Sequence, residues 1–174
     1  MQTSTAGNSN KQVGFTLIEL AVVILLISLF SLISIPLFSH TGQGGLDVSA
    51  RKLAGTVKYL FNEAALTGQE HRLIFNLDRG TYRGMIQEAD GSLEEMTGTG
   101  KETSLRQNVR LSLLSLPGRG SFSAGEVTVR IHPSGWVEQT VVQLSTDDDT
   151  LTLRINPLTG SSEIFEGARD FVQN

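Results

Sequence analysis

The sequence predicts an α+β protein in which a long hydrophobic N-terminal helix precedes an antiparallel, β-rich globular head. Three observations favour this fold class in the 174-residue chain: an apolar run over residues 15–38, a helical apolar period over 46–67, and short alternating segments after residue 68. Short strands joined by turn-length connections are typical of antiparallel sheets, and we expect two packed sheets.

Composition limits the classes of function. The chain has 18 acidic and 14 basic residues, a formal net charge of −4 and no cysteine. The acidic excess argues against nucleic-acid binding, which depends on clustered Lys and Arg. A sequence without cysteine excludes disulfides, thiolate metal sites and cysteine nucleophiles. The mean hydropathy of −0.02 hides the contrast between an apolar N-terminal segment and a polar remainder.

The apolar run predicts a single membrane-spanning helix over residues 15–38. At about 1.5 Å per residue this helix would extend roughly 36 Å, enough to cross a hydrocarbon core of about 30 Å. No charged residue lies between Leu20 and Leu46, and no small-residue cleavage site of a secretory signal follows the run. Pro36 removes one backbone hydrogen bond, so we expect a helix bend there.

Glu19 is an ionisable residue near the start of this run. Two roles remain open for it: a functional carboxylate within the membrane, or an interfacial residue stabilised by the helix N-terminus. The residues that lead to it, after a short polar leader, are Gly14-Phe15-Thr16-Leu17-Ile18-Glu19. This stretch closely resembles the class III signal of type IV pilins and type II secretion pseudopilins.

The resemblance implies how the N-terminus is processed. In that family a membrane-embedded prepilin peptidase cuts after the glycine and methylates the new N-terminus. Residues 1–14 would then be a removed leader peptide, with Gly14 before the cleaved bond and Phe15 as the N-methylated first residue. Glu19 would be the assembly glutamate, and the Phe15 amine its partner. The two lie one turn apart within one helix, and between staggered subunits the same pair would fix the axial register, because an unpaired charge in a low-dielectric layer is costly.

Three segments follow the apolar run. Gly42, Gly44 and Gly45 indicate a flexible break over 39–45. Apolar residues then recur every three or four positions, which predicts an amphipathic helix over 46–67 that packs on the head. After Gly68 the period becomes two, so residues 68–174 are expected to form the β-rich domain. The predicted strands are 73–77, 81–87, 109–116, 126–132, 136–144, 150–156 and 161–165, with polar loops at 88–104 and 117–125.

One long N-terminal helix followed by a β-rich head is the pilin-like architecture. The head resembles the H-type minor pseudopilins of type II secretion systems, the GspH family, and FimT-like minor pilins of type IV pili share the resemblance in part. The stretches that carry it are 51–59, 62–65, 72–78, 132–135 and 156–160.

The first family implies a structural subunit of the pseudopilus, which serves protein secretion across the outer membrane of a Gram-negative bacterium. The partners would be other major and minor pseudopilins, the prepilin peptidase and methyltransferase, and the inner-membrane secretion platform. The protein would be single-pass in the inner membrane, with its head in the periplasm. The alternative family implies adhesion or DNA uptake.

The sequence offers no catalytic constellation. The three histidines fall in separate segments, and neither an H-E-x-x-H pair nor a G-x-S-x-G elbow is present. We therefore expect no enzymatic activity and no cofactor or metal.

Two further features have a functional and a structural interpretation. Asp147–Asp149 offers carboxylates to Ca²⁺, but a solvated hairpin turn is favoured because consecutive carboxylates point in different directions. Trp136 is favoured as a core residue at a strand start, and an exposed partner contact is the alternative.

Overall fold

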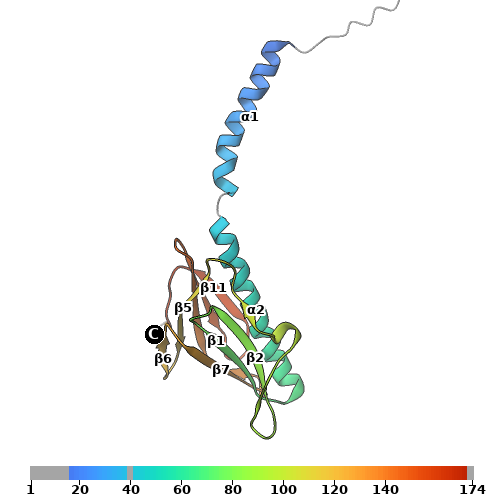
Figure 1. Ribbon diagram of the computed structural model, residues 1–174, viewed down its shortest axis with the longest axis vertical. Coiled ribbons are helices and arrows are strands. Elements are labelled where there is room, and N and C mark those ends of the chain that lie inside the picture. The colour runs from blue at the N-terminus through green and yellow to red at the C-terminus, as the bar shows by residue number, and fades with distance from the viewer. Residues whose placement is uncertain (1–15, 39–40, 172–174) are drawn as a thin grey trace, which may run out of the picture. The chain divides into compact units, whose positions relative to one another are not determined.

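The computed structural model describes residues 16–38 and 41–171, with side chains for 16–30 and 44–171. These residues form two compact units with a boundary between residues 40 and 41 (Figure 1). The first unit contains helix α1, and the second, the head, contains helix α2 and two antiparallel sheets. The predicted fold class is thereby confirmed. Gly14 and Phe15 lie outside the described residues.

Helix α1 spans Leu17–Phe38. All of its described side chains, up to Phe30, are exposed within the chain. The helix includes Pro36, where the bend stays a prediction. Over the residues that the structure describes, no helix is both long enough and apolar enough to cross a membrane.

Helix α2 spans Thr41–Thr67 and begins before the predicted start at residue 46. The predicted flexible break is therefore wrong for residues 41–45. Glycine in a helix costs only about 1 kcal/mol relative to alanine, and tertiary packing overrides that cost. Here the buried side chains of Leu46 and Ala50 fix the early turns against the sheets. A Cβ added to Gly45 would lie 3.9 Å from the Arg106 and Val109 side chains, so the glycine faces this part of the head.

Two antiparallel sheets complete the head (Figure 1). Sheet A has the strand order β3-β2-β1-β7-β8, with β4 also paired to β2, and sheet B has the order β11-β10-β9-β5-β6. The strands of sheet A are β1 His71–Asn76, β2 Thr81–Gln87, β3 Leu93–Glu95, β4 Thr103–Ser104, β7 Glu126–His132 and β8 Trp136–Val137. The strands of sheet B are β5 Arg110–Leu116, β6 Gly120–Phe122, β9 Thr140–Ser145, β10 Thr150–Ile155 and β11 Ser162–Glu166.

The sheets differ from the prediction in two places. The predicted strand 136–144 is two strands, β8 in sheet A and β9 in sheet B, so the chain changes sheets between them. The predicted polar loops contain short strands, namely β3, β4 and β6, and a 3-10 turn at Gly98–Gly100. Within 88–104 the Met96 side chain is buried, which fixes this segment on the head.

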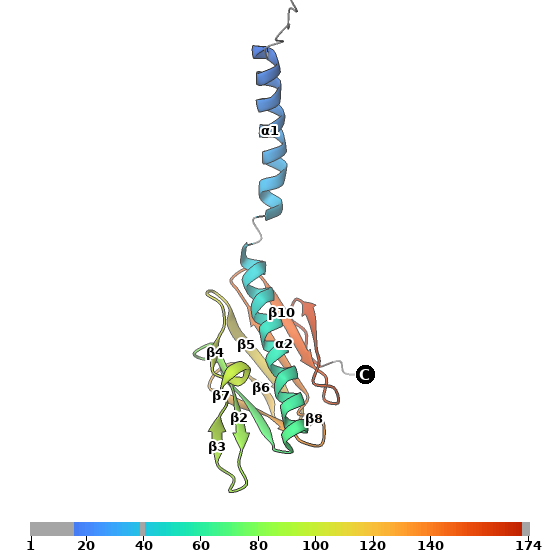
Figure 2. The ribbon, with the colours of Figure 1, turned by 90° about the vertical axis from the view of Figure 1, so that its right-hand side faces the viewer.

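The core lies between α2 and the inner faces of both sheets. One stripe of α2 is fully buried and contacts β1 and β7 of sheet A and β10, β11 and β9 of sheet B. Figure 2 shows α2 in front, with β2 on one side of it and β10 on the other. The buried stripe consists of Leu46, Ala50, Leu53, Val57, Leu60 and Ala64. The sheets contribute Leu73, Phe75, Val127, Val129, Ile131, Leu114, Val142, Leu144, Leu153 and Ile155.

Two close approaches fix α2 against the sheets. A Cβ added to Gly84 on β2 would lie 2.8 Å from Leu60 Cδ2, so the bare backbone there makes room for the leucine. On the other side, a Cβ at Gly160 would lie 2.6 Å from Phe61 Cβ. Lys58 reinforces this second contact, because its Nζ donates a hydrogen bond of 2.7 Å to the Thr159 carbonyl.

We predict that Gly160→Ala destabilises the head by about 2–4 kcal/mol, from left-handed backbone strain and overpacking against Phe61. Gly118→Ala is the matched control, because Gly118 also has a positive φ, 74°, but a Cβ there meets nothing within 4 Å. The control should lose about 1 kcal/mol. Urea unfolding of residues 41–174, followed by circular dichroism, gives both free energies of unfolding, and equal losses would contradict the contact with Phe61.

Candidate functional site

The start of α1 is a capping box formed by Thr16 and Glu19. The Glu19 backbone N–H donates to Thr16 Oγ1 at 3.3 Å, and Glu19 Oε2 accepts from the Thr16 N–H and hydroxyl, both at 2.9 Å. T-x-x-E directly before an apolar run is the sequence form of this motif. The unpaired N–H groups and partial positive charge of a helix N-terminus also favour a carboxylate there. Within this chain Glu19 is thus a helix-start residue that is hydrogen-bonded to Thr16.

Of the three predicted site residues, the structure describes Glu19 but not Gly14 and Phe15. Gly14 and Phe15 lie outside the described residues, so their processing roles stay predictions. The assembly role of Glu19 concerns a neighbouring subunit and likewise stays a prediction. Thr16 is a site residue that the resemblance does not single out, although its spacing from Glu19 marks it in the sequence.

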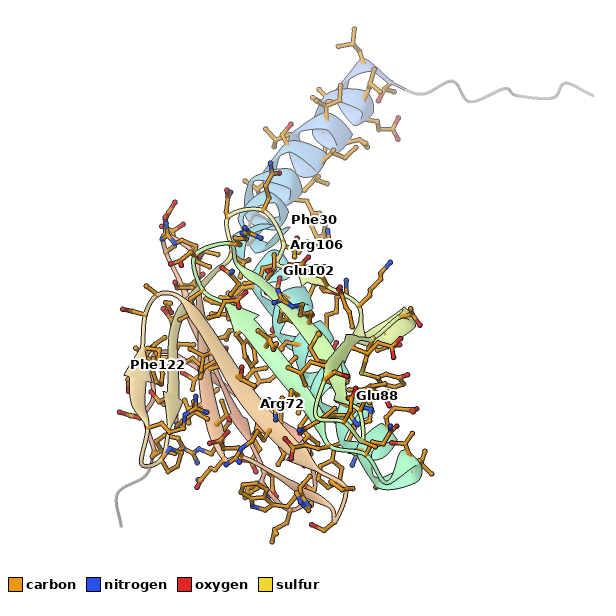
Figure 3. The ribbon with its side chains drawn as sticks, turned by 60° about the horizontal axis from the view of Figure 1, so that its bottom comes forward. Phe30, Arg72, Glu88, Glu102, Arg106 and Phe122 are labelled. Carbon is orange, nitrogen blue, oxygen red and sulfur yellow. The ribbon has the colours of Figure 1, made fainter. Side chains whose placement is uncertain are left out.

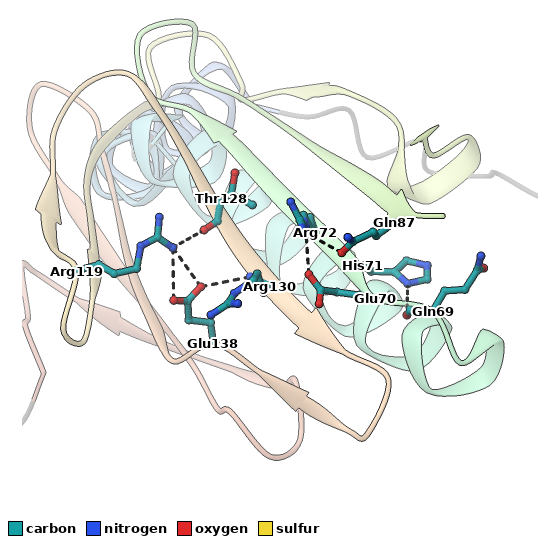
Figure 4. Close-up of polar contacts among 9 residues, drawn as sticks. All are labelled: Gln69, Glu70, His71, Arg72, Gln87, Arg119, Thr128, Arg130 and Glu138. Atoms are coloured by element: carbon teal, nitrogen blue, oxygen red, sulfur yellow. Dashed lines mark hydrogen bonds and ion pairs between the residues drawn. The ribbon is translucent and has the colours of Figure 1, made fainter. Parts of the chain in front are cut away.

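A second polar arrangement lies on the outer face of sheet A, where Figure 3 shows Arg72 in front of the strands. Figure 4 shows Glu138 between Arg119 and Arg130. Arg119 Nη1 lies 3.2 Å from Glu138 Oε2 and donates to the Thr128 carbonyl at 2.8 Å. An open cavity of about 420 Å³ is lined by all five of these residues. We name it the arginine cleft.

The histidines and the other potential metal ligands among the described residues do not form a site of their own. The described residues contain no group of three or more His, Asp or Glu side chains arranged to hold a metal. His71 is fully buried with Nδ1 3.0 Å from the Gln69 carbonyl, whereas His132 is exposed beside Ser134. His40 lies outside the described residues.

The acidic turn and the tryptophan are both at the surface. Residues 146–149 connect β9 to β10, and Asp147 pairs with Arg110 at 2.9 Å, both side chains being exposed. Trp136 is 39% exposed, so the prediction that it packs in the core is wrong. Strand alternation explains this, because the adjacent Val137 takes the inward position of β8 and is fully buried.

Two side chains have shifted pKa values. Burial raises the pKa of the Tyr82 phenol, whose ring packs in the core beneath α2. Hydrogen bonds from the Ser92 hydroxyl and N–H lower the pKa of Asp90 in the turn between β2 and β3. Both shifts follow from local structure, and both groups lie away from Glu19 and from the residues that line the arginine cleft.

Comparison with known proteins identifies an N-terminal motif and a fold. Residues 9–35 match the family described as the prokaryotic N-terminal methylation motif. No curated protein matches the chain in sequence. A crystal structure of the minor pseudopilin EpsH from the type II secretion system of Vibrio cholerae is similar with a TM-score of 0.61 and 17% identity. That match covers 75% of this chain and 100% of the EpsH chain.

Two further solved structures are similar. Another structure of Vibrio cholerae EpsH has a TM-score of 0.59 and 16% identity, covering 72% of this chain and 99% of that one. The solution structure of E. coli GspH has a TM-score of 0.50 and 15% identity, covering 72% and 89%. The chain therefore carries an N-terminal methylation motif and has the fold of the minor pseudopilins.

We predict that Thr16→Val weakens the first turn of α1 by about 1 kcal/mol, because valine keeps the shape of threonine but cannot accept the Glu19 N–H. Thr16→Ser retains the hydroxyl and is the control. Amide hydrogen exchange at Glu19 and Leu20, whose N–H groups donate to Thr16, should be about fivefold faster in the valine variant of the detergent-solubilised chain. Equal exchange in the valine and serine variants would be inconsistent with the capping box.

Proposed function

We propose that this chain is a minor pseudopilin, a non-enzymatic structural subunit of a type II secretion pseudopilus. The observation that carries the proposal is the presence, in one chain, of an N-terminal methylation motif and a head with the fold of EpsH and GspH. The motif alone also fits a minor pilin of a type IV pilus. The head favours secretion, because the similar structures named above are pseudopilins.

In this proposal the prepilin peptidase removes residues 1–14 and methylates the amine of Phe15. The apolar segment 15–38 then anchors the subunit in the inner membrane, and the head occupies the periplasm. The described part of α1 supports this anchor. Its side chains from Leu17 to Phe30 are almost all aliphatic or aromatic, and none of them is buried within the chain. Lipid, and later neighbouring helices, would cover that surface.

Glu19 then acts when the subunit leaves the lipid for the fibre. Among the described residues of the single subunit, the Glu19 carboxylate accepts hydrogen bonds from Thr16, which carries no charge. The methylated ammonium group of Phe15 on a neighbouring subunit supplies the opposite charge. Because such a pair forms only at one axial offset of two helices, it fixes the register of the fibre.

The first prediction of this function is a processed N-terminus. Intact-mass measurement of protein extracted from membranes should give a chain that begins at Phe15 and carries one additional methyl group. Gly14→Val should remain uncut, because the peptidase requires the small residue before the bond, and a neighbouring change such as Asn10→Ala should be processed normally. A mature chain that begins at Met1, or beyond Phe38, would exclude the proposed processing.

The second prediction separates the charge of Glu19 from its capping role. Glu19→Gln keeps an oxygen that accepts from Thr16 but removes the charge, whereas Glu19→Ala removes both. We expect both variants to be cleaved and to stay in the membrane, and both to lose most incorporation into the fibre and most secretion.

Complementation of a strain that lacks the protein, with crosslinking to fellow pseudopilins, measures this loss. Wild-type secretion by Glu19→Gln together with failure of Glu19→Ala would show that the carboxylate serves only as a helix cap.

A further inference from the structure

The exposed face of α2 carries a band of positive charge. Residues 48–62 include no acidic residue and three cations, Arg51, Lys52 and Lys58. All three are exposed, and Figure 2 looks onto this helix from outside the head. The chain as a whole has a formal net charge of −4, so the band has the sign opposite to that of the rest of the molecule.

The head does not neutralise this band itself. Among the residues that the structure describes, none of the three cations takes part in a salt bridge. Lys58 donates to the Thr159 carbonyl, which carries no charge. In the arginine cleft, by contrast, carboxylates of the chain pair with two of the three guanidinium groups. The positive charge of α2 is therefore available to an anionic partner.

A glycine lies at the centre of the band. Gly55 is exposed in the middle of the 27-residue helix, and a Cβ there would meet nothing within 4 Å. Glycine is the least favourable residue after proline in a helix interior. Packing within the head does not require it here, in contrast to Gly84 and Gly160. A bare backbone at this point allows another chain to approach the helix closely.

The surface neighbours of Gly55 form a rim around it. Residues three and four positions apart are adjacent on the surface of a helix. Around Gly55 these positions hold Arg51, Lys52, Lys58 and Tyr59. Arginine and tyrosine are enriched among the residues that contribute most to binding at protein interfaces. We name Gly55 and these four residues the glycine notch.

A cavity of about 180 Å³ adjoins the notch at Lys52. Arg106 also lines it, and the Arg106 N–H donates to the Ser49 hydroxyl at 3.2 Å. No acidic residue lines this cavity, and Arg106 takes part in no salt bridge within residues 16–38 and 41–171. Two cations beside a small cavity fit a carboxylate, which accepts charge-assisted hydrogen bonds.

We propose that the glycine notch binds an acidic segment of a different subunit of the fibre. The backbone of that segment lies against Gly55, and its carboxylates pair with the cations of the rim and with Arg106. Complementary charge of this kind selects the partner, because a subunit without the carboxylates leaves the cations unpaired. This inference rests on the proposed function, for which it names a contact between the head and a neighbouring subunit of another kind.

Photocrosslinking of the full chain in the membranes of its own bacterium tests the contact. A benzophenone amino acid at Asn62, exposed two turns from Gly55, leaves all five notch residues in place. Illumination should join it to a fellow pseudopilin, at a peptide that contains Asp or Glu. The same probe at Ala124, exposed between β6 and β7, is the control and should not capture that peptide. Capture of only a second copy of this chain, of lipid, or of nothing would overturn the proposal.

Charge reversal shows whether the cations and the acids face one another. Arg51→Glu combined with Lys52→Glu should lower the yield at Asn62 about tenfold. Arg79→Glu, at an exposed position in the turn between β1 and β2, should leave the yield unchanged. Lysine in place of the acids of the captured peptide should restore the yield of the double variant. A yield that the double reversal does not lower would also overturn the proposal.

Substitution of Gly55 separates docking from folding. Gly55→Ala should raise the thermal unfolding midpoint of the detergent-solubilised chain, because alanine is favoured in a helix and has room here. Gly55→Leu fills the notch and should lower the crosslinking yield about tenfold. Ala65→Leu, at another exposed position of α2, should leave the yield unchanged. Equal yields from the two leucine variants would contradict a partner that lies against Gly55.

The same strains separate this contact from the proposed function. Intact mass and fibre incorporation are measured for the unsubstituted chain and for every variant. Normal processing and incorporation without the crosslinked peptide would reject the docking at the notch alone. An unsubstituted chain that is neither cut nor incorporated would reject the pseudopilin assignment, whatever its crosslinks.

Discussion

The head depends on one constraint: a single face of α2 must cover the apolar faces of two separate sheets. Leu53, Val57 and Leu60 are fully buried in this position. A sheet with one apolar face needs a second layer to bury it, and here the same helix contacts both sheets. The positions of the sheet edges, turns and surface clefts relative to one another follow from this shared helix.

The distance between α2 and each sheet is set by a glycine that lies opposite a large side chain of the helix. Gly84 leaves room for Leu60 on the sheet A side, and Gly160 leaves room for Phe61 on the sheet B side. Protein interiors are packed densely enough that one added methyl group at such a point displaces the helix or its partner strand. Two glycines on opposite sides of α2 therefore hold the helix at a defined distance from each sheet.

The sequence predicts those parts of the fold whose pattern is long enough to show a period. Alternation revealed the strands at 81–87 and 126–132, and the three-four spacing revealed most of α2. The two-residue strand β8 shows no period of its own, so 136–144 looks like one strand although it crosses between sheets. The glycines at 42, 44 and 45 led to the prediction of a flexible break, because the sequence does not show the tertiary packing that holds this segment in α2. The hydrogen bonds between Glu19 and Thr16 could be predicted from the T-x-x-E spacing. The arginine cleft could not, because it depends on the pairing of β1 with β7, which sequence spacing does not reveal.

The capping box makes the proposed assembly step energetically accessible. A helix cap of this kind contributes little free energy, whereas a charge that becomes buried without a partner is costly. In the proposed fibre, Glu19 would exchange its neutral partner, Thr16, for a cation, and a charged partner is the more favourable one in a low-dielectric environment. Hydrogen bonds within the subunit keep the carboxylate at the helix start in the meantime. The same four residues, 16–19, thus begin the helix in the single subunit and present the charge that a neighbouring subunit would bind.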